Sequence, residues 1–124
     1  MRKRRTVNYK ELIVWKKAIK LSIGIFQATK SFPKSEIYGM VSQMRRSAFS
    51  IPSNIAEGYC RGGKAEYRQF LQIAYASAAE LETQLIISLK TKMLSSKDFK
   101  KLKPLLIEIL KMLNKMILSL RKNR

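Results

Sequence analysis

Apolar residues recur at intervals of three or four along nearly all of this 124-residue sequence, which is the spacing of an amphipathic α-helix. Breaks divide the pattern into four segments, at about residues 8–30, 35–60, 64–91 and 96–122. No segment has the period of two that is typical of a strand. The sequence therefore predicts an all-α domain over residues 8–122, preceded by a basic tail over residues 1–7.

Proline, glycine and capping residues mark the ends of the predicted helices. Pro33 disfavours helical geometry at the residue before it, and the pair Gly62-Gly63 is typical of a helix stop followed by a turn. Pro52 and Pro104 fall inside predicted helices, where a proline removes a hydrogen bond and favours a bend. The predicted N-caps are Asn8, Ser35, and Ser95 or Ser96.

Each predicted helix carries one apolar stripe that could face a common core. The stripes are Leu12, Trp15, Ile19, Ile23 and Phe26; Tyr38, Val41, Met44, Ala48, Ile51 and Ile55; Tyr67, Phe70, Ala74, Ala78, Leu81 and Leu85; and Leu102, Leu106, Ile109, Leu113, Met116, Ile117 and Leu120. Long helices joined by short connections favour antiparallel neighbours. The expected fold is therefore an antiparallel up-down-up-down four-helix bundle.

The charge of the chain is strongly unbalanced, with 26 Lys and Arg against 8 Asp and Glu and a net charge of +18. Such an excess favours polyanionic partners, although lysine clusters can also be simple solvated faces. No zinc-finger or RNA-motif signature is present, so binding would depend on phosphates. The predicted nucleic-acid-binding residues are Arg2, Lys3, Arg4, Arg5, Lys16, Lys17, Lys20, Lys97, Lys100, Lys101, Lys103, Arg121 and Lys122.

Residues suited to catalysis are scarce. The sequence has no histidine, which is the commonest general base and metal ligand, and it has no phosphate-binding glycine loop. We therefore predict no enzymatic activity, no catalytic residue, no metal site and no cofactor. The single cysteine, Cys60, excludes an internal disulfide and fits a cytoplasmic location. No apolar run approaches the roughly 20 residues that cross a bilayer, and no signal peptide follows the basic start.

Polar residues at helical spacing in the second and third predicted helices form a second candidate site. We interpret Arg45, Arg46, Asn54, Glu57, Glu80 and Gln84 as a structural polar network, within or between subunits. The alternative is that Glu57 and Glu80 form the carboxylate pair of a hydrolase. Tyr9 and Trp15 are interpreted as packing anchors, while Tyr59 could serve either packing or binding.

Several segments together resemble one known family. They are Y-K-E-L-I-V-W-K-K-A at residues 9–18, Q-x-R-R-S-A-x-S-I-P-S-N-I-A-E-G at 43–58, E-Y-x-x-F-L-x-I-A-x-x-S at 66–77, E-L-E-T-Q-L at 80–85 and K-M-L-N at 111–114. Nearly the whole chain is similar to the bacterial ribosomal RNA intervening-sequence proteins, also called S23 ribosomal proteins. The block at 43–58 is the most diagnostic.

The resemblance implies a four-helix bundle that assembles into a homopentameric ring, encoded in some bacteria within a sequence that interrupts the large-subunit ribosomal RNA gene. This family is similar in fold to the accessory variability proteins of diversity-generating retroelements, which are basic pentamers that bind nucleic acid and a reverse transcriptase. It supplies no catalytic residues. The leading expectation is a non-enzymatic RNA- or DNA-binding oligomer with a reverse transcriptase as a further partner. The alternative is a protein-interaction scaffold with only nonspecific nucleic-acid affinity.

Overall fold

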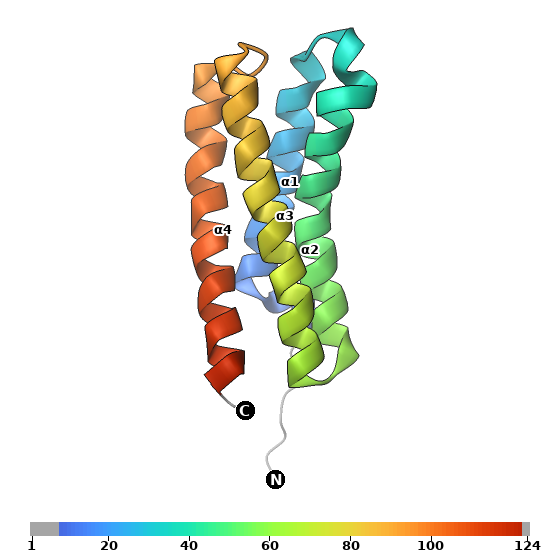
Figure 1. The fold of residues 1–124 in the computed structure, drawn as a ribbon, viewed down its shortest axis with the longest axis vertical. Helices are drawn as coiled ribbons and strands as arrows, with labels where there is room; N and C mark the ends of the chain where they lie inside the picture. The colour runs from blue at the N-terminus through green and yellow to red at the C-terminus, as the bar shows by residue number, and fades with distance from the viewer. Residues whose placement is uncertain (1–7, 123–124) are drawn as a thin grey trace.

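Four long helices pack into a bundle in the computed structural model, which describes residues 8–122 (Figure 1). The helices are α1 (Ile13–Ala28), α2 (Ser42–Arg61), α3 (Lys64–Lys90) and α4 (Ser96–Lys122). Contacts join α1 to α2, α2 to α3, α3 to α4, and α4 back to α1. Figure 1 shows the α1–α2 and α3–α4 connections at one end and the α2–α3 connection at the other. The described residues contain no strand, so the all-α four-helix prediction is confirmed.

The first predicted helix, residues 8–30, is divided into three pieces. A 3₁₀ turn, Tyr9–Glu11, precedes α1, and a second one, Thr29–Ser31, follows it. Asn8 caps the first turn, because its Oδ1 accepts a hydrogen bond from the Lys10 backbone nitrogen at 2.8 Å. Leu12 then adopts extended geometry, with φ −70° and ψ 129°. The helix proper therefore begins five residues later than the predicted start, at Ile13.

The connection between α1 and α2 is longer than predicted, and Ser35 does not cap α2. A 3₁₀ turn, Lys34–Glu36, leads into a π-helical turn, Ile37–Val41, in which Gly39 has φ −111° and ψ −110°. The Glu36 carboxylate accepts a hydrogen bond from the Met40 backbone nitrogen at 3.2 Å and so caps this turn. This non-helical geometry breaks the register between the turn and α2. Tyr38, predicted as a core residue, is consequently 96% exposed.

The other helix ends agree with the sequence. Gly62 has φ 91°, a left-handed conformation that glycine adopts at little cost, and α3 begins two residues later. Ser95 Oγ accepts a hydrogen bond from the Asp98 backbone nitrogen at 3.0 Å at the start of α4. Pro52 and Pro104 both lie inside unbroken helices, and the predicted bends at these residues stay predictions.

The core confirms the predicted stripe of α4 and most of those of α2 and α3, but not that of α1; on α3, Leu71 is buried, whereas Tyr67 and Phe70 are only partly buried. On α1 the structure buries Val14, Ala18, Leu21 and Ile25 in place of the predicted stripe. Ile23 is 56% exposed and Phe26 is 38% exposed, while Leu12, Trp15 and Ile19 are partly buried. The prediction was wrong because α1 carries apolar residues on most of its sides. No helix within residues 8–122 combines the length and hydropathy that crossing a bilayer requires.

Candidate nucleic-acid interface

The predicted basic residues fall into three groups in the structure. Arg2, Lys3, Arg4, Arg5 and the side chain of Lys122 lie outside the part of the chain that can be described. The structure describes in full the α1 cluster (Lys16, Lys17 and Lys20) and the α4 cluster (Lys97, Lys100, Lys101 and Lys103), and most of their members are exposed. Arg121 is also exposed, but it lies 20 residues along α4 from Lys101, about 30 Å at 1.5 Å per residue. It therefore belongs to the opposite end of the bundle.

The structure brings two of these clusters together where α1 packs against α4. Lys20 of α1 and Lys101 of α4 line one surface hollow of about 310 Å³, which Asp98 also lines. Nearer the start of α1, Lys17 Nζ lies 3.1 Å from Glu108 Oε2 of α4. Lys16, one turn before Lys20, is exposed. The α1 and α4 clusters thus form parts of one basic region, although Glu108 neutralises Lys17.

Lys103 does not join this region. It points towards α3, where its Nζ lies 3.8 Å from Glu82 Oε2, and its side chain is only 29% exposed. The same ammonium group also lies 5.2 Å from the centre of the Phe99 ring. Lys103 therefore serves the α3–α4 contact, and the prediction that groups it with Lys97, Lys100 and Lys101 is not supported by its geometry.

Two further lysines extend the basic region and were missed in the sequence. Lys111 and Lys115 are exposed on α4. Lys97 and Lys115 are 18 residues apart, about five turns at 3.6 residues per turn, so they lie on the same side of the helix. This spacing was the signal that could have found them. We define the α4 lysine row as Lys97, Lys100, Lys111 and Lys115.

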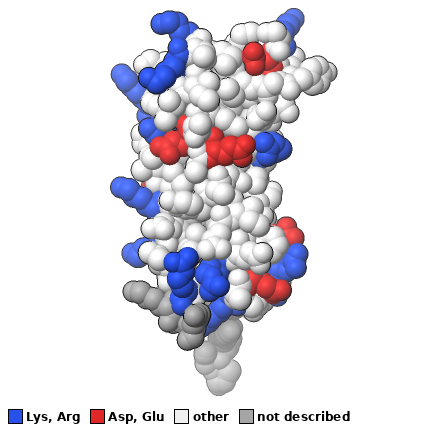
Figure 2. Space-filling view, in the orientation of Figure 1, with Lys and Arg blue, Asp and Glu red and all other residues white. Residues whose placement is uncertain are grey.

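The acidic side chains nearest to this row are directed at other cations or lie beside it: Glu108, on the same side of α4, pairs with Lys17 of α1, and Asp98 lines the α1–α4 hollow. None of the four row lysines makes an ion pair with a described residue. Figure 2 shows Lys and Arg side chains at several heights along the edge where Figure 1 places α4, and acidic side chains across the middle of the same view. Glu80 and Glu82 of α3 pair with Arg46 and Lys103, which reach towards α3. No lysine of the row is therefore neutralised by an ion pair with a described residue, and the four lysines outnumber the one carboxylate on the same side of α4.

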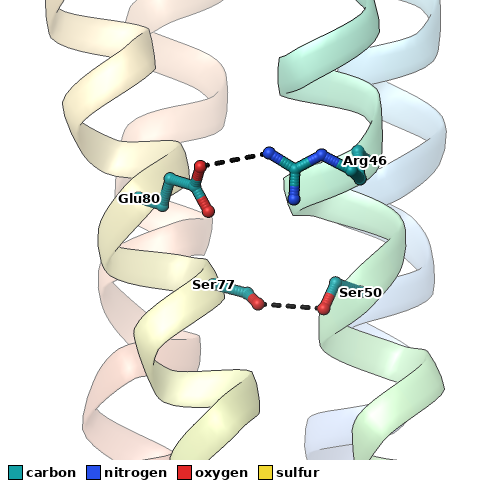
Figure 3. A network of polar contacts seen from close by, with 4 residues as sticks. All are labelled: Arg46, Ser50, Ser77 and Glu80. Atoms are coloured by element: carbon teal, nitrogen blue, oxygen red, sulfur yellow. Dashed lines mark hydrogen bonds and ion pairs between the residues drawn. The ribbon is translucent and has the colours of Figure 1, made fainter.

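Figure 3 shows that some members of the predicted polar network meet between α2 and α3. Arg46 Nη2 lies 3.3 Å from Glu80 Oε2, and the hydroxyls of Ser50 and Ser77 lie 2.9 Å apart. Asn54 Nδ2 donates to the backbone oxygen of Ser50 at 2.8 Å and to its hydroxyl at 2.9 Å. Because Arg46 and Glu80 are both largely exposed, their ion pair contributes at most about 1 kcal/mol.

The other three residues of the predicted network have different surroundings. Arg45 donates to the Thr29 hydroxyl and to the backbone oxygen of Phe26. Glu57 pairs with Arg61, one turn further along α2, at 3.0 Å. Gln84 is buried, and its Oε1 has no hydrogen-bond partner among the described residues. The network is therefore smaller than predicted.

Glu57 and Glu80 do not form a carboxylate pair. Gly58, next to Glu57, packs so closely on α3 that an added Cβ would lie 2.6 Å from Phe70 Cβ. Glu80 lies ten residues further along α3 than Phe70, about 15 Å at 1.5 Å per residue. Within residues 8–122, no group of three or more His, Cys, Asp or Glu side chains is placed to hold a metal ion. Glu57 and Glu80 therefore lie too far apart to act as the pair on which the hydrolase alternative depends.

The aromatic residues near the α2–α3 turn pack against one another. The rings of Tyr59 and Tyr67 meet edge to face, with centroids 5.8 Å apart. At the start of the chain, Tyr9 and Trp15 make a similar contact at 5.5 Å, and Trp15 packs on the core. Tyr9 and Trp15 are thus packing anchors, as predicted, and the contact with Tyr67 gives Tyr59 a packing role.

Tyr67 gives the fold a pH dependence in the alkaline range. Burial raises the pKa of its phenol from 10.0 to about 12, and Tyr59 adds to the shift. Between these pH values the unfolded chain binds fewer protons than the folded chain, so stability falls as pH rises. The stability that this phenol contributes is fully present below pH 10, its ordinary pKa.

Replacing Tyr67 by Phe removes this titrating group. The free energy of unfolding, measured by urea denaturation across this pH range, should decline less with rising pH for Tyr67→Phe than for the wild type. Equal declines would contradict the assignment.

Comparisons with known proteins agree with these features. A family model described as 23S rRNA-intervening sequence protein matches residues 10–115. A similar solved structure is that of a protein of unknown function from the S23 ribosomal protein family of Bacteroides thetaiotaomicron. It is 25% identical, with a TM-score of 0.78, and the match covers 85% of this chain and 95% of that chain. A search of the curated proteins finds no match.

Proposed function

This chain belongs to the 23S rRNA-intervening sequence protein family, and we propose that it is a cytoplasmic, non-enzymatic protein that binds RNA or DNA mainly through phosphate groups. The observation that carries the proposal is the α4 lysine row, whose four ammonium groups have no acidic partner among the described residues. Lysine is a flexible point charge, which suits contact with a phosphate backbone, but it lacks the rigid planar fork of donors that arginine offers for specific recognition. Such binding is expected to depend on charge density more than on base sequence.

The proposal includes assembly of antiparallel up-down-up-down bundles into a homopentameric ring. Support comes from the apolar stripe of α1, defined as Trp15, Ile19, Ile23 and Phe26, which the core leaves partly or largely exposed. A helix that is apolar on most sides is typical of one that is buried, and a neighbouring subunit would bury this stripe. The number five comes from the family resemblance, as does a reverse transcriptase partner. A ring would also bring several lysine rows to one nucleic acid.

The salt dependence of binding tests the nucleic-acid proposal. Matched lengths of structured RNA, single-stranded RNA and duplex DNA would be titrated at several salt concentrations. We expect log K to fall linearly with log salt, with a slope that corresponds to about four or more neutralised phosphates. Equal, weak binding to all three that disappears near physiological salt would contradict a dedicated nucleic-acid function.

The second candidate is a protein-interaction scaffold, which the exposed apolar stripe of α1 favours. Apolar contacts are little screened by salt, whereas contacts between lysine and phosphate are weakened strongly. A protein partner that stays bound at high salt, beside weak nucleic-acid binding, would support this candidate.

A further inference from the structure

A hollow of about 710 Å³ lies where the end of α1, the connecting turns and the first part of α2 meet. It is separate from the basic region of α1 and α4, since no residue of α4 lines it. Its walls come from three segments with different local structure: the 3₁₀ turn after α1, the π-helical turn and the first two turns of α2. The non-helical geometry in the connection is what leaves this space open.

The hollow is lined by positive charge. Lys30, Lys34, Arg45 and Arg46 line it, and the described lining contains no Asp or Glu. Arg46 shares its charge with Glu80, which lies outside the hollow. The net field inside therefore favours an anion, and a phosphate group meets that requirement.

Arg45 is held in place before any ligand arrives. Its Nε donates to the Thr29 hydroxyl at 3.0 Å, and its Nη2 donates to the Phe26 backbone oxygen at 3.2 Å. Its guanidinium also stacks on the Phe26 ring, 4.1 Å from the centroid. A side chain fixed on three sides loses little conformational entropy when it binds, and its remaining N–H groups can still donate.

Exposed aromatic rings stand beside these cations. Tyr38 is 96% exposed and Phe49 is 42% exposed, and both line the hollow, together with the half-exposed Ile37. Exposed rings next to positive charges are the combination that binds single-stranded nucleic acids, because bases stack on the rings while cations contact the backbone. In a duplex the bases are stacked on each other and unavailable to such rings.

We propose that this hollow binds an unpaired nucleotide of a single-stranded RNA or DNA segment, with its base on Tyr38 and Phe49 and its phosphate at Arg45, Lys30 and Lys34. This inference rests on the proposed nucleic-acid function and adds to it a preference for single strands. The α4 lysine row would bind single strands and duplexes alike, whereas the hollow would bind single strands alone. A second copy of the chain is the alternative occupant, but it would bring a further strongly positive surface to this basic hollow.

The test is the double variant Tyr38→Ala/Phe49→Ala, which removes both rings and changes no charge. The probes are a labelled single-stranded RNA of about 12 nucleotides, within the range that one binding fold covers, and a duplex of equal length. We expect the affinity for the single strand to fall about tenfold or more, since each stacked base contributes substantially. The affinity for the duplex and both salt slopes should stay unchanged.

Two controls make the result specific. Tyr38→Phe keeps the ring and should bind the single strand like the wild type. Ile73→Ala/Tyr75→Ala removes two exposed apolar side chains from α3, away from the hollow, and should leave binding unchanged. Circular dichroism would check that every variant keeps its helices.

The outcomes separate this proposal from the proposed function. If the double variant lost affinity equally for the single strand and the duplex, or for neither, the hollow would not be a nucleotide site. The lysine row could still bind nucleic acid in that case. A changed subunit number in light scattering would overturn the nucleotide site too, because the hollow would then hold a neighbouring copy. Failure of the wild type to bind any nucleic acid at physiological salt would instead defeat the proposed function itself.

Discussion

Reversing the charge of the α4 lysine row, with Lys97, Lys100, Lys111 and Lys115 all replaced by glutamate, is expected to lower nucleic-acid affinity about a thousandfold or more at physiological salt. Four attractive contacts with phosphates become four repulsive ones, and the counterions that binding would release are no longer there to release. All four side chains are exposed, and glutamate and lysine have similar helix propensities, so α4 should stay folded. Fluorescence anisotropy over a salt series measures the effect, with circular dichroism as the check on folding.

A matched variant separates this surface from net charge. Replacing Lys64, Arg68, Lys90 and Lys92 by glutamate changes the charge by the same amount at positions outside α4. We expect this variant to lose much less affinity, because binding depends on where the charges lie. Equal losses in the two variants would show that the row has no special role. Undiminished binding in the row variant would refute the interface.

Ile23→Asp is expected to convert the proposed ring into monomers. Ile23 is 56% exposed in the single chain, so the substitution leaves no cavity and should change the stability of the bundle by about 0.5 kcal/mol or less. Within a subunit interface, by contrast, the new carboxylate would be desolvated without a partner, which costs several kcal/mol. Since every subunit of a ring carries the substitution, each interface is weakened. Light scattering at micromolar concentration measures the result.

The control for this prediction is Ile73→Asp. Ile73 is 43% exposed on α3 and lies outside the apolar stripe of α1. This variant should keep the subunit number of the wild type. A wild-type protein that is monomeric at micromolar concentration would contradict the ring. An oligomer that persists in Ile23→Asp would show that the subunit interface does not include this part of α1.

The four helices were predictable because their signals are local. Apolar spacing of three and four residues, the Asn8 and Ser95 caps and the left-handed Gly62 all act within one or two helical turns. Most core residues of α2, α3 and α4 followed for the same reason, since each of these helices has a clear polar side. The Arg46–Glu80 contact could also be anticipated from helical spacing on two neighbouring helices.

The failures are concentrated where a local signal allows more than one answer. On α1 both Leu21 and Ile23 fit an apolar stripe, and only packing against α2 and α4 determines that Leu21 is buried. Lys103 and Lys101 are two residues apart with the same charge, yet one faces Glu82 and the other the α1–α4 hollow. The sequence pattern carries no information about which neighbour each side of a helix meets.

By itself, the sequence determined the helix content, the breaks between helices and the excess of positive charge, because these depend on residue type and on neighbours within a few positions. Only the tertiary structure decided which side of α1 is buried, that Lys20 and Lys101 share one hollow, and that Tyr38 stands exposed beside Arg45. Those features arise from contacts between residues far apart in the chain. The packing that stabilises them involves all four helices, and no short segment of the sequence contains the residues on both sides of such a contact.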